Sequence, residues 1–91
     1  MQASPEFHKF GRRFIQDIDW IAPTEEEMYD FVLSDLIGKE RARLREFIDR
    51  ALQDDVPDDG LMRLWDSVDS DIYFPTVQNL RGLLRGARDR L

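Results

Sequence analysis

Apolar residues recur at helical spacing through most of the chain, and the clearest case lies in residues 39–53. Five apolar side chains fall there at positions i, i+3, i+4, i+7 and i+8, which places them along one face of an α-helix. They are Leu44, Phe47, Ile48, Ala51 and Leu52. Because Arg41 and Arg45 share the opposite side with acidic residues, this segment is predicted to be an amphipathic helix.

Two more helices are predicted before this one. Ser4 followed by Pro5 is typical of a helix start, and we expect that helix to end near Gln16. Thr24 with a glutamate three residues later has the spacing of a capping box, which predicts a helix ending near Gly38. The short connection to residues 39–53 predicts two antiparallel neighbours. Between the first two helices, residues 18–22 fit either a short extended segment or a packed loop.

Two further helices are predicted after Pro57, which interrupts the helix of residues 39–53. Asp55 or Asp58 is expected to cap the first of them, whose apolar stripe is Leu61, Leu64, Trp65 and Val68. Residues 70–75 form an apolar linker that we expect to pack against the core. Thr76 then caps a last helix running to the end of the chain. Gly82 and Gly86 in that helix either permit close approach of a neighbour or merely loosen it.

These signals predict an all-α protein: one small domain, residues 1–91, of about five helices packed as a compact bundle. Hydrophobic residues make up 42% of the chain and charged residues 35%, which is typical of a folded globule with a highly charged surface. No apolar run approaches the roughly 20 residues that cross a bilayer. Cysteine is absent, which fits a reducing compartment, so we expect a cytoplasmic protein.

Negative charge is concentrated in residues 53–71, QDDVPDDGLMRLWDSVDSD. Seven aspartates stand there against a single base, Arg63, and the net charge of the segment equals the −6 of the whole protein. The aspartates are Asp54, Asp55, Asp58, Asp59, Asp66, Asp69 and Asp71. Clustered carboxylates of this kind can accept hydrogen bonds from arginine and lysine and steer a basic partner toward the protein. The alternative is that they only cap helix ends and remain solvated.

The aromatic residues of the same segment are candidates for anchors in a protein interface. Trp65 or Tyr73 would serve in this way if its side chain is partly exposed. Trp65 also belongs to the apolar stripe of its helix, which favours a position in the core.

The sequence contains little that predicts catalysis. His8 is the only histidine, and the serines lie outside any nucleophile motif. The spacing of the aspartates does not match a calcium loop. We therefore expect no enzymatic activity, no metal site and no cofactor.

A second hypothesis concerns the last helix, where Arg81, Arg85 and Arg88 align on one side. Such a face is compatible with a small regulatory protein that binds nucleic acid. The same arginines could instead pair with nearby acids, and the overall negative charge favours this simpler interpretation.

A pattern of residue types runs along nearly the whole chain from Phe10 onward. Its parts, in order, are residues 14–19 (FIQDID), residues 24–27 (TEEE), Leu44 to Leu52, Leu61 with Leu64 and Trp65, then Tyr73, Arg81, Leu83 and Leu84. This pattern resembles a family of small helical immunity proteins from bacterial contact-dependent growth inhibition systems. The chain departs from the family at Ile15, where a histidine or another polar residue is common, and at Leu83, where an aromatic residue is common.

The resemblance implies that the protein binds the toxic C-terminal domain of a large exported effector, commonly a nuclease, and protects the cell that makes both. The family supplies no fixed set of inhibitory residues. Gln16 and Asp17 lie within the pattern; we interpret them as a helix-end cap that holds the turn into Trp20, with a functional role as the alternative.

Overall fold

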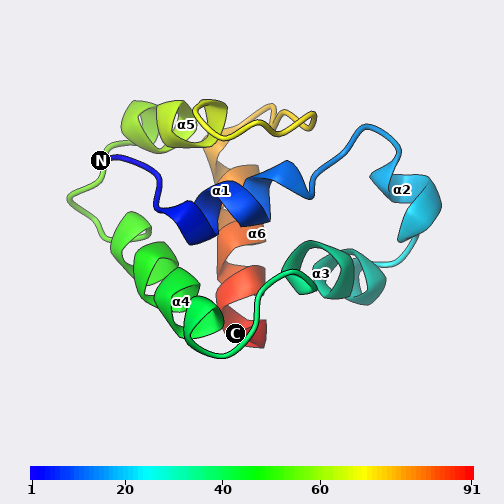
Figure 1. Cartoon of the computed structure of the whole chain (residues 1–91). Coiled ribbons are helices and arrows are strands. Elements are labelled where there is room, and N and C mark those ends of the chain that lie inside the picture. Colours follow the sequence, from blue (N-terminus) through cyan, green and yellow to red (C-terminus); the bar gives the residue numbers. More distant parts are fainter.

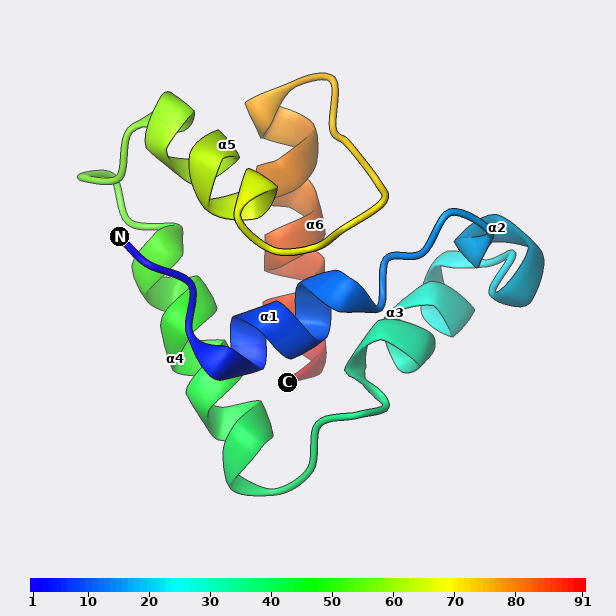
Figure 2. The same cartoon turned by 45° about the horizontal axis from the view of Figure 1, so that its top comes forward.

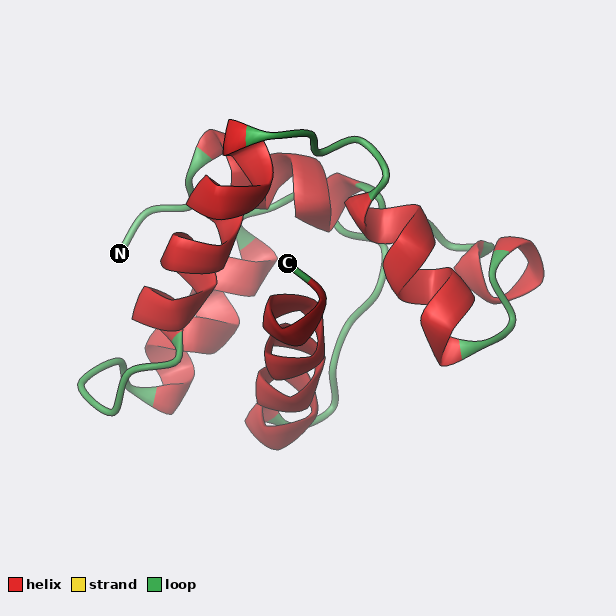
Figure 3. Cartoon of the chain, turned by 90° about the horizontal axis from the view of Figure 1, so that it is seen from below, coloured by secondary structure: helices red, strands yellow, loops and turns green.

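The computed structural model describes all residues, 1–91, and contains helices and loops only (Figures 1 and 3). The all-α prediction is thus confirmed, with six helices where about five were expected. The helices are α1 (Pro5–Arg12), α2 (Ile18–Ile21), α3 (Glu25–Leu33), α4 (Lys39–Ala51), α5 (Asp58–Asp66) and α6 (Val77–Arg90).

Three predicted helix starts are confirmed by hydrogen bonds from backbone amides to capping hydroxyls. The bonds are Phe7 N to Ser4 Oγ at 3.1 Å, Glu27 N to Thr24 Oγ1 at 3.1 Å, and Asn79 N to Thr76 Oγ1 at 3.2 Å. Each bond satisfies an amide that the first turn of a helix leaves without a partner. These starts fix where α1, α3 and α6 begin.

The predicted cap of α5 is wrong. Pro57 occupies the N-cap position and Asp58 is already the first helical residue, so no side chain caps this helix. Asp55 points to Arg50 instead, with Arg50 Nη1 donating to its Oδ1 at 2.8 Å. Asp58 also pairs with an arginine, Arg81 of α6, at 2.9 Å.

Helix ends also differ from the predictions. α1 ends at Arg12 rather than near Gln16, and residues 18–21 form the short helix α2 rather than an extended segment or a loop. α3 ends at Leu33, ahead of Gly38. Gly38 does have a positive φ, 51°, but its ψ of −118° is not that of a left-handed cap, and it lies immediately before α4 rather than capping α3.

α3 and α4 are not the antiparallel neighbours that their short connection predicted. α1 packs against α3 and α4, and α6 packs against α3, α4 and α5, so that α1 and α6 bring the other helices together (Figures 1 and 2). Residues 34–38 connect α3 to α4 through a turn that contains no helix. This turn lets α3 diverge from α4 and leaves α2 at one edge of the molecule (Figure 2).

Trp65 lies at the centre of an aromatic cluster and is only 2% exposed. Its indole is met edge-on by four phenylalanine rings from other parts of the chain. They are Phe7 at 6.0 Å, Phe10 at 6.2 Å, Phe14 at 5.2 Å and Phe74 at 5.4 Å between ring centroids. Edge-to-face contacts of this kind contribute about 0.5–1.5 kcal/mol each beyond the area that they bury. The cluster therefore ties α5 to α1 and to the linker before α6.

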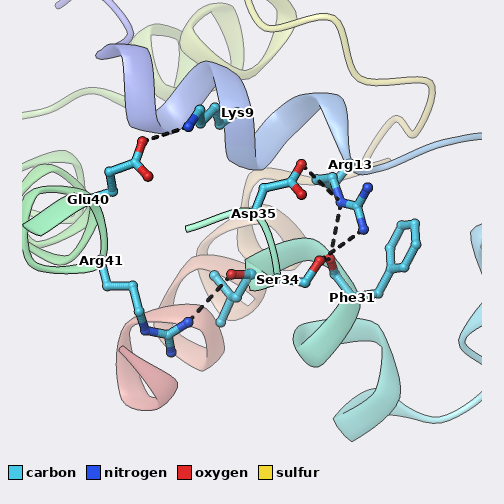
Figure 4. A network of polar contacts seen from close by, with 8 residues as sticks. Lys9, Arg13, Phe31, Ser34, Asp35, Glu40 and Arg41 are labelled. Atoms are coloured by element: carbon cyan, nitrogen blue, oxygen red, sulfur yellow. Dashed lines mark hydrogen bonds and ion pairs between the residues drawn. The ribbon is translucent and has the colours of Figure 1, made fainter. Parts of the chain in front are cut away.

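The side chain of Arg13 holds the C-terminal end of α3 and the turn that follows it (Figure 4). Arg13 Nε donates to the carbonyl oxygen of Phe31 at 3.2 Å, and its Nη2 donates to Ser34 Oγ at 2.9 Å. The same guanidinium lies 3.6 Å from Asp35 and 4.0 Å from the centre of the Phe31 ring. A cation here complements the negative end of the helix dipole and satisfies a carbonyl that the helix leaves open.

Two glycines permit close packing that the sequence did not fully reveal. A Cβ atom on Gly11 would lie 2.3 Å from Val68 Cγ2, and one on Gly86 would lie 2.1 Å from the hydroxyl of Tyr29. Tyr29 is buried and donates its hydroxyl proton to the carbonyl of Leu83, so its ring has little freedom to move. Close approach is thus confirmed at Gly86 but not at Gly82, whose surroundings are open.

The two glycines of α6 give a matched pair of substitutions. Gly86→Ala should lower the free energy of unfolding by about 1–3 kcal/mol, because the added methyl group displaces a buried ring. Gly82→Ala should raise it by up to about 1 kcal/mol through helix propensity alone. Urea denaturation of both variants measures the difference. Equal effects would show that α6 and Tyr29 do not pack as described.

Candidate protein-binding surface

The seven aspartates of residues 53–71 are all exposed and fall into two groups at opposite ends of α5. The first group precedes or opens the helix and consists of Asp54, Asp55, Asp58 and Asp59. The second group closes the helix and continues into the loop behind it, and consists of Asp66, Asp69 and Asp71.

Arginines neutralise most of the first group. Asp55 pairs with Arg50 at 2.8 Å, Asp58 with Arg81 at 2.9 Å, and Asp59 with Arg63 at 3.5 Å. Arg81 comes from α6, and its side chain is only 16% exposed, so the Asp58 carboxylate lies over a largely buried cation. Only Asp54 in this group has no ion pair. The first group therefore presents less net negative charge than its composition suggests.

The second group keeps its charge. Asp66, Asp69 and Asp71 have no lysine or arginine nitrogen within ion-pair distance, and all three side chains face solvent. Free carboxylates on an exposed loop interact with an approaching cation without first breaking an internal pair. We therefore regard this end of α5 as the stronger candidate for recognition.

The structure separates the two aromatic candidates. Trp65 is buried in the core and cannot serve as a surface anchor, which corrects that part of the prediction and confirms the core assignment of its stripe. Tyr73 is 76% exposed and meets the stated condition. The linker around Tyr73 packs as expected, since Ile72 and Phe74 lie against the core on either side of it.

Trp65 also positions the loop that carries the second group. Its Nε1 donates to the carbonyl oxygen of Ile72 at 3.0 Å, and the amide of Asp71 donates to the carbonyl oxygen of Phe14 at 2.9 Å. The latter bond attaches the loop to the chain just after α1. The loop after α5 thus lies beside the segment that connects α1 to α2 (Figure 2).

Sequence reasoning overlooked a second acidic segment, which begins at this junction. Residues 14–38 contain seven acidic side chains and no lysine or arginine. Two of these acids are paired with bases from elsewhere, Glu26 with Arg90 and Asp35 with Arg13. The sequence feature that could have revealed this segment is its lack of lysine and arginine over 25 residues, which is less apparent than a cluster of aspartates.

Gln16 and Asp17 do not act as the side-chain cap that was predicted. Asp17 occupies the N-cap position of α2, but its side chain makes no capping hydrogen bond. Its backbone carbonyl holds the turn instead, accepting from the amides of Trp20 at 3.0 Å and Ile21 at 3.3 Å. The side chains of Gln16 and Asp17 are both exposed and available for other contacts.

The arginine face of α6 is largely engaged within the molecule. Arg81 pairs with Asp58, and Arg88 pairs with Asp49 of α4 at 3.3 Å. Arg85 is exposed and has no ion pair. Two of the three guanidinium groups thus stabilise contacts between α6 and the other helices, as the simpler interpretation expected.

His8 is half-buried beside a shallow hollow of about 360 Å³, and an adjoining hollow of about 450 Å³ shares Met1, Gly60 and Arg63 with it. No group of three or more histidine or acidic side chains lies in a position to hold a metal ion.

None of the helices combines the length and the apolar character needed to span a membrane.

The chain matches no protein-family model, no curated protein and no solved structure.

The Asp55 pair allows a test of how far the first group is neutralised. The hydrogen bond from Arg50 lowers the pKa of Asp55 below its ordinary value of about 3.9. Asp55 therefore stabilises the fold above that ordinary pKa, and this contribution is lost as the pH falls through the lowered value.

Arg50→Gln should raise the pKa of Asp55 toward its ordinary value, as measured by NMR titration of the carboxyl carbon. Arg45→Gln is the control, because Arg45 is exposed on the same helix without an ion pair. An unchanged Asp55 pKa in Arg50→Gln would contradict the pairing.

Proposed function

We propose that this protein is an immunity protein that binds the toxin domain of a contact-dependent growth inhibition effector and thereby neutralises it. The observation that supports binding is the group of unpaired carboxylates at one end of α5, Asp66, Asp69 and Asp71, whose loop is hydrogen-bonded to Phe14 at the start of the base-free segment. The identity of the partner comes from the family resemblance of the sequence.

The chemistry of such a partner agrees with this surface. Nucleases need basic clefts to hold the phosphates of RNA or DNA, and an acidic protein can occupy such a cleft in place of the nucleic acid. Free carboxylates accept charge-assisted hydrogen bonds from arginine, which are stronger than those between neutral groups. In this proposal the protein acts in the cytoplasm, by sequestration and without catalysis of its own.

The free carboxylates should act mainly on the rate of association. Their field extends about 10 Å at moderate salt and attracts a basic partner before contact. Tyr73, at 76% exposure beside Asp71, would add apolar contact once the surfaces meet. Asp58 and Asp59 are poor test positions, because reversing their charge also breaks pairs with Arg81 and Arg63.

Asp69→Asn with Asp71→Asn should slow association with the toxin domain by about 3–10-fold at low salt, and the difference should narrow as salt is added. The partner to use is the C-terminal domain of the long exported protein that the proposal places in the upstream reading frame. Surface plasmon resonance gives the rate constants, and survival of cells that express the toxin domain gives the protection.

Glu46→Gln with Asp89→Asn is the control pair. It changes the net charge by the same amount at exposed positions of α4 and α6 that carry no ion pair. Equal association rates for the two pairs would remove the second aspartate group from the interface. No binding by the unaltered protein would overturn the proposed function itself.

A further inference from the structure

The short helix α2 lies at an edge of the molecule (Figure 1). It exposes two large apolar side chains. Trp20 is 89% exposed and Ile21 is 52% exposed. Trp20 is the most exposed large hydrophobic side chain in the protein, whereas the other tryptophan, Trp65, is buried at 2%. Tryptophan is enriched at the centres of protein interfaces, so this adjacent exposed pair is a candidate contact surface.

α2 is a fixed support rather than a loose loop. Ile18 and Ala22, four residues apart, are each 5% exposed, so one side of the helix is buried in the fold. The amide of Ala22 donates to the carbonyl of Ile18 at 2.8 Å, which closes the turn. With this side anchored, Trp20 and Ile21 are directed outward. An anchor that is already ordered loses little conformational freedom on binding.

The charges around α2 define the kind of partner. Asp17, Asp19, Glu25 and Glu27 are exposed, and none has an ion pair. The nearest bases along the chain, Arg13 and Lys39, lie outside the segment. An apolar tip surrounded by free carboxylates is complementary to an apolar pocket with arginine or lysine at its rim.

We propose that α2 is the anchor of the partner interface, with Trp20 entering an apolar pocket that is rimmed by cations on a basic protein. This inference rests on the proposed function and specifies which part of the surface supplies the affinity. The aspartates after α5 then provide the attraction, and α2 provides the burial. A second copy of this chain is disfavoured as the occupant because its own α2 surroundings carry the same negative charge.

Trp20→Ala should weaken binding of the toxin domain by about 30-fold or more, as expected for a buried tryptophan at the centre of an interface. Its melting temperature should be unchanged, because Trp20 makes little contact within the protein. Ile37→Ala is the matched control: Ile37 is 74% exposed, and the turn between α3 and α4 that contains it lies away from α2 (Figure 2), so its loss should leave affinity unaltered.

Tryptophan fluorescence gives a second measurement. The Trp20→Phe variant gives the emission of Trp65 alone, which is subtracted from that of the unaltered protein. In the free protein, Trp20 emission should be quenched strongly by acrylamide. The ratio of caesium to iodide quenching should exceed that of free N-acetyltryptophanamide, because the surrounding carboxylates attract caesium and repel iodide. Binding of the toxin domain should protect Trp20 from acrylamide. A caesium-to-iodide quenching ratio equal to or below that of N-acetyltryptophanamide would contradict the negative surroundings on which the choice of partner depends.

The outcomes separate this inference from the proposed function. If the unaltered protein binds the toxin domain and Trp20→Ala binds equally well, the anchor is overturned while the proposed function stands. If the unaltered protein does not bind, both are overturned. Sedimentation velocity tests the other occupant: a dimer that Trp20→Ala converts to a monomer would assign α2 to self-association and overturn the inference.

Discussion

The burial of Trp65 is the interaction on which the rest of this structure depends. Its indole contacts rings from α1 and from the linker before α6, and its one polar atom is satisfied by the carbonyl of Ile72. A single side chain of α5 therefore fixes both the end of α1 and the loop of Asp69, Asp71 and Tyr73. Because the loop is also bonded to Phe14, two acidic segments that are distant in sequence become neighbours.

Arginines pair with the carboxylates in some regions of this acidic protein and leave them unpaired in others. At the start of α5, the aspartates form ion pairs that offset their negative charge. Their partners are Arg50, Arg63 and Arg81. After α5 and along residues 14–38, most carboxylates have no such partner. Recognition of a basic protein needs charges that are free to form new pairs, so net charge alone is a poor guide to where it occurs.

Much of the helical fold could be predicted because its signals are local. Capping hydroxyls at Ser4, Thr24 and Thr76 identified three helix starts, and apolar spacing identified the core stripe that includes Trp65. The predictions that were wrong concerned features set by tertiary contacts. For example, Asp58 pairs with Arg81 and so joins α5 to α6, and no spacing along the chain reveals this pair. The four residues of α2 were too few for periodicity to distinguish a helix, so the exposure of Trp20 could not be foreseen.

The central claim is that the two acidic segments form one binding surface for a basic partner. Hydrogen–deuterium exchange of the complex with the toxin domain tests it most directly, because it reports both segments in one experiment. Binding should slow exchange in residues 66–74 and in residues 16–22 together, with the outer side of α4 unchanged. Protection confined to α4 or α6, with both acidic segments exchanging as in the free protein, would contradict it.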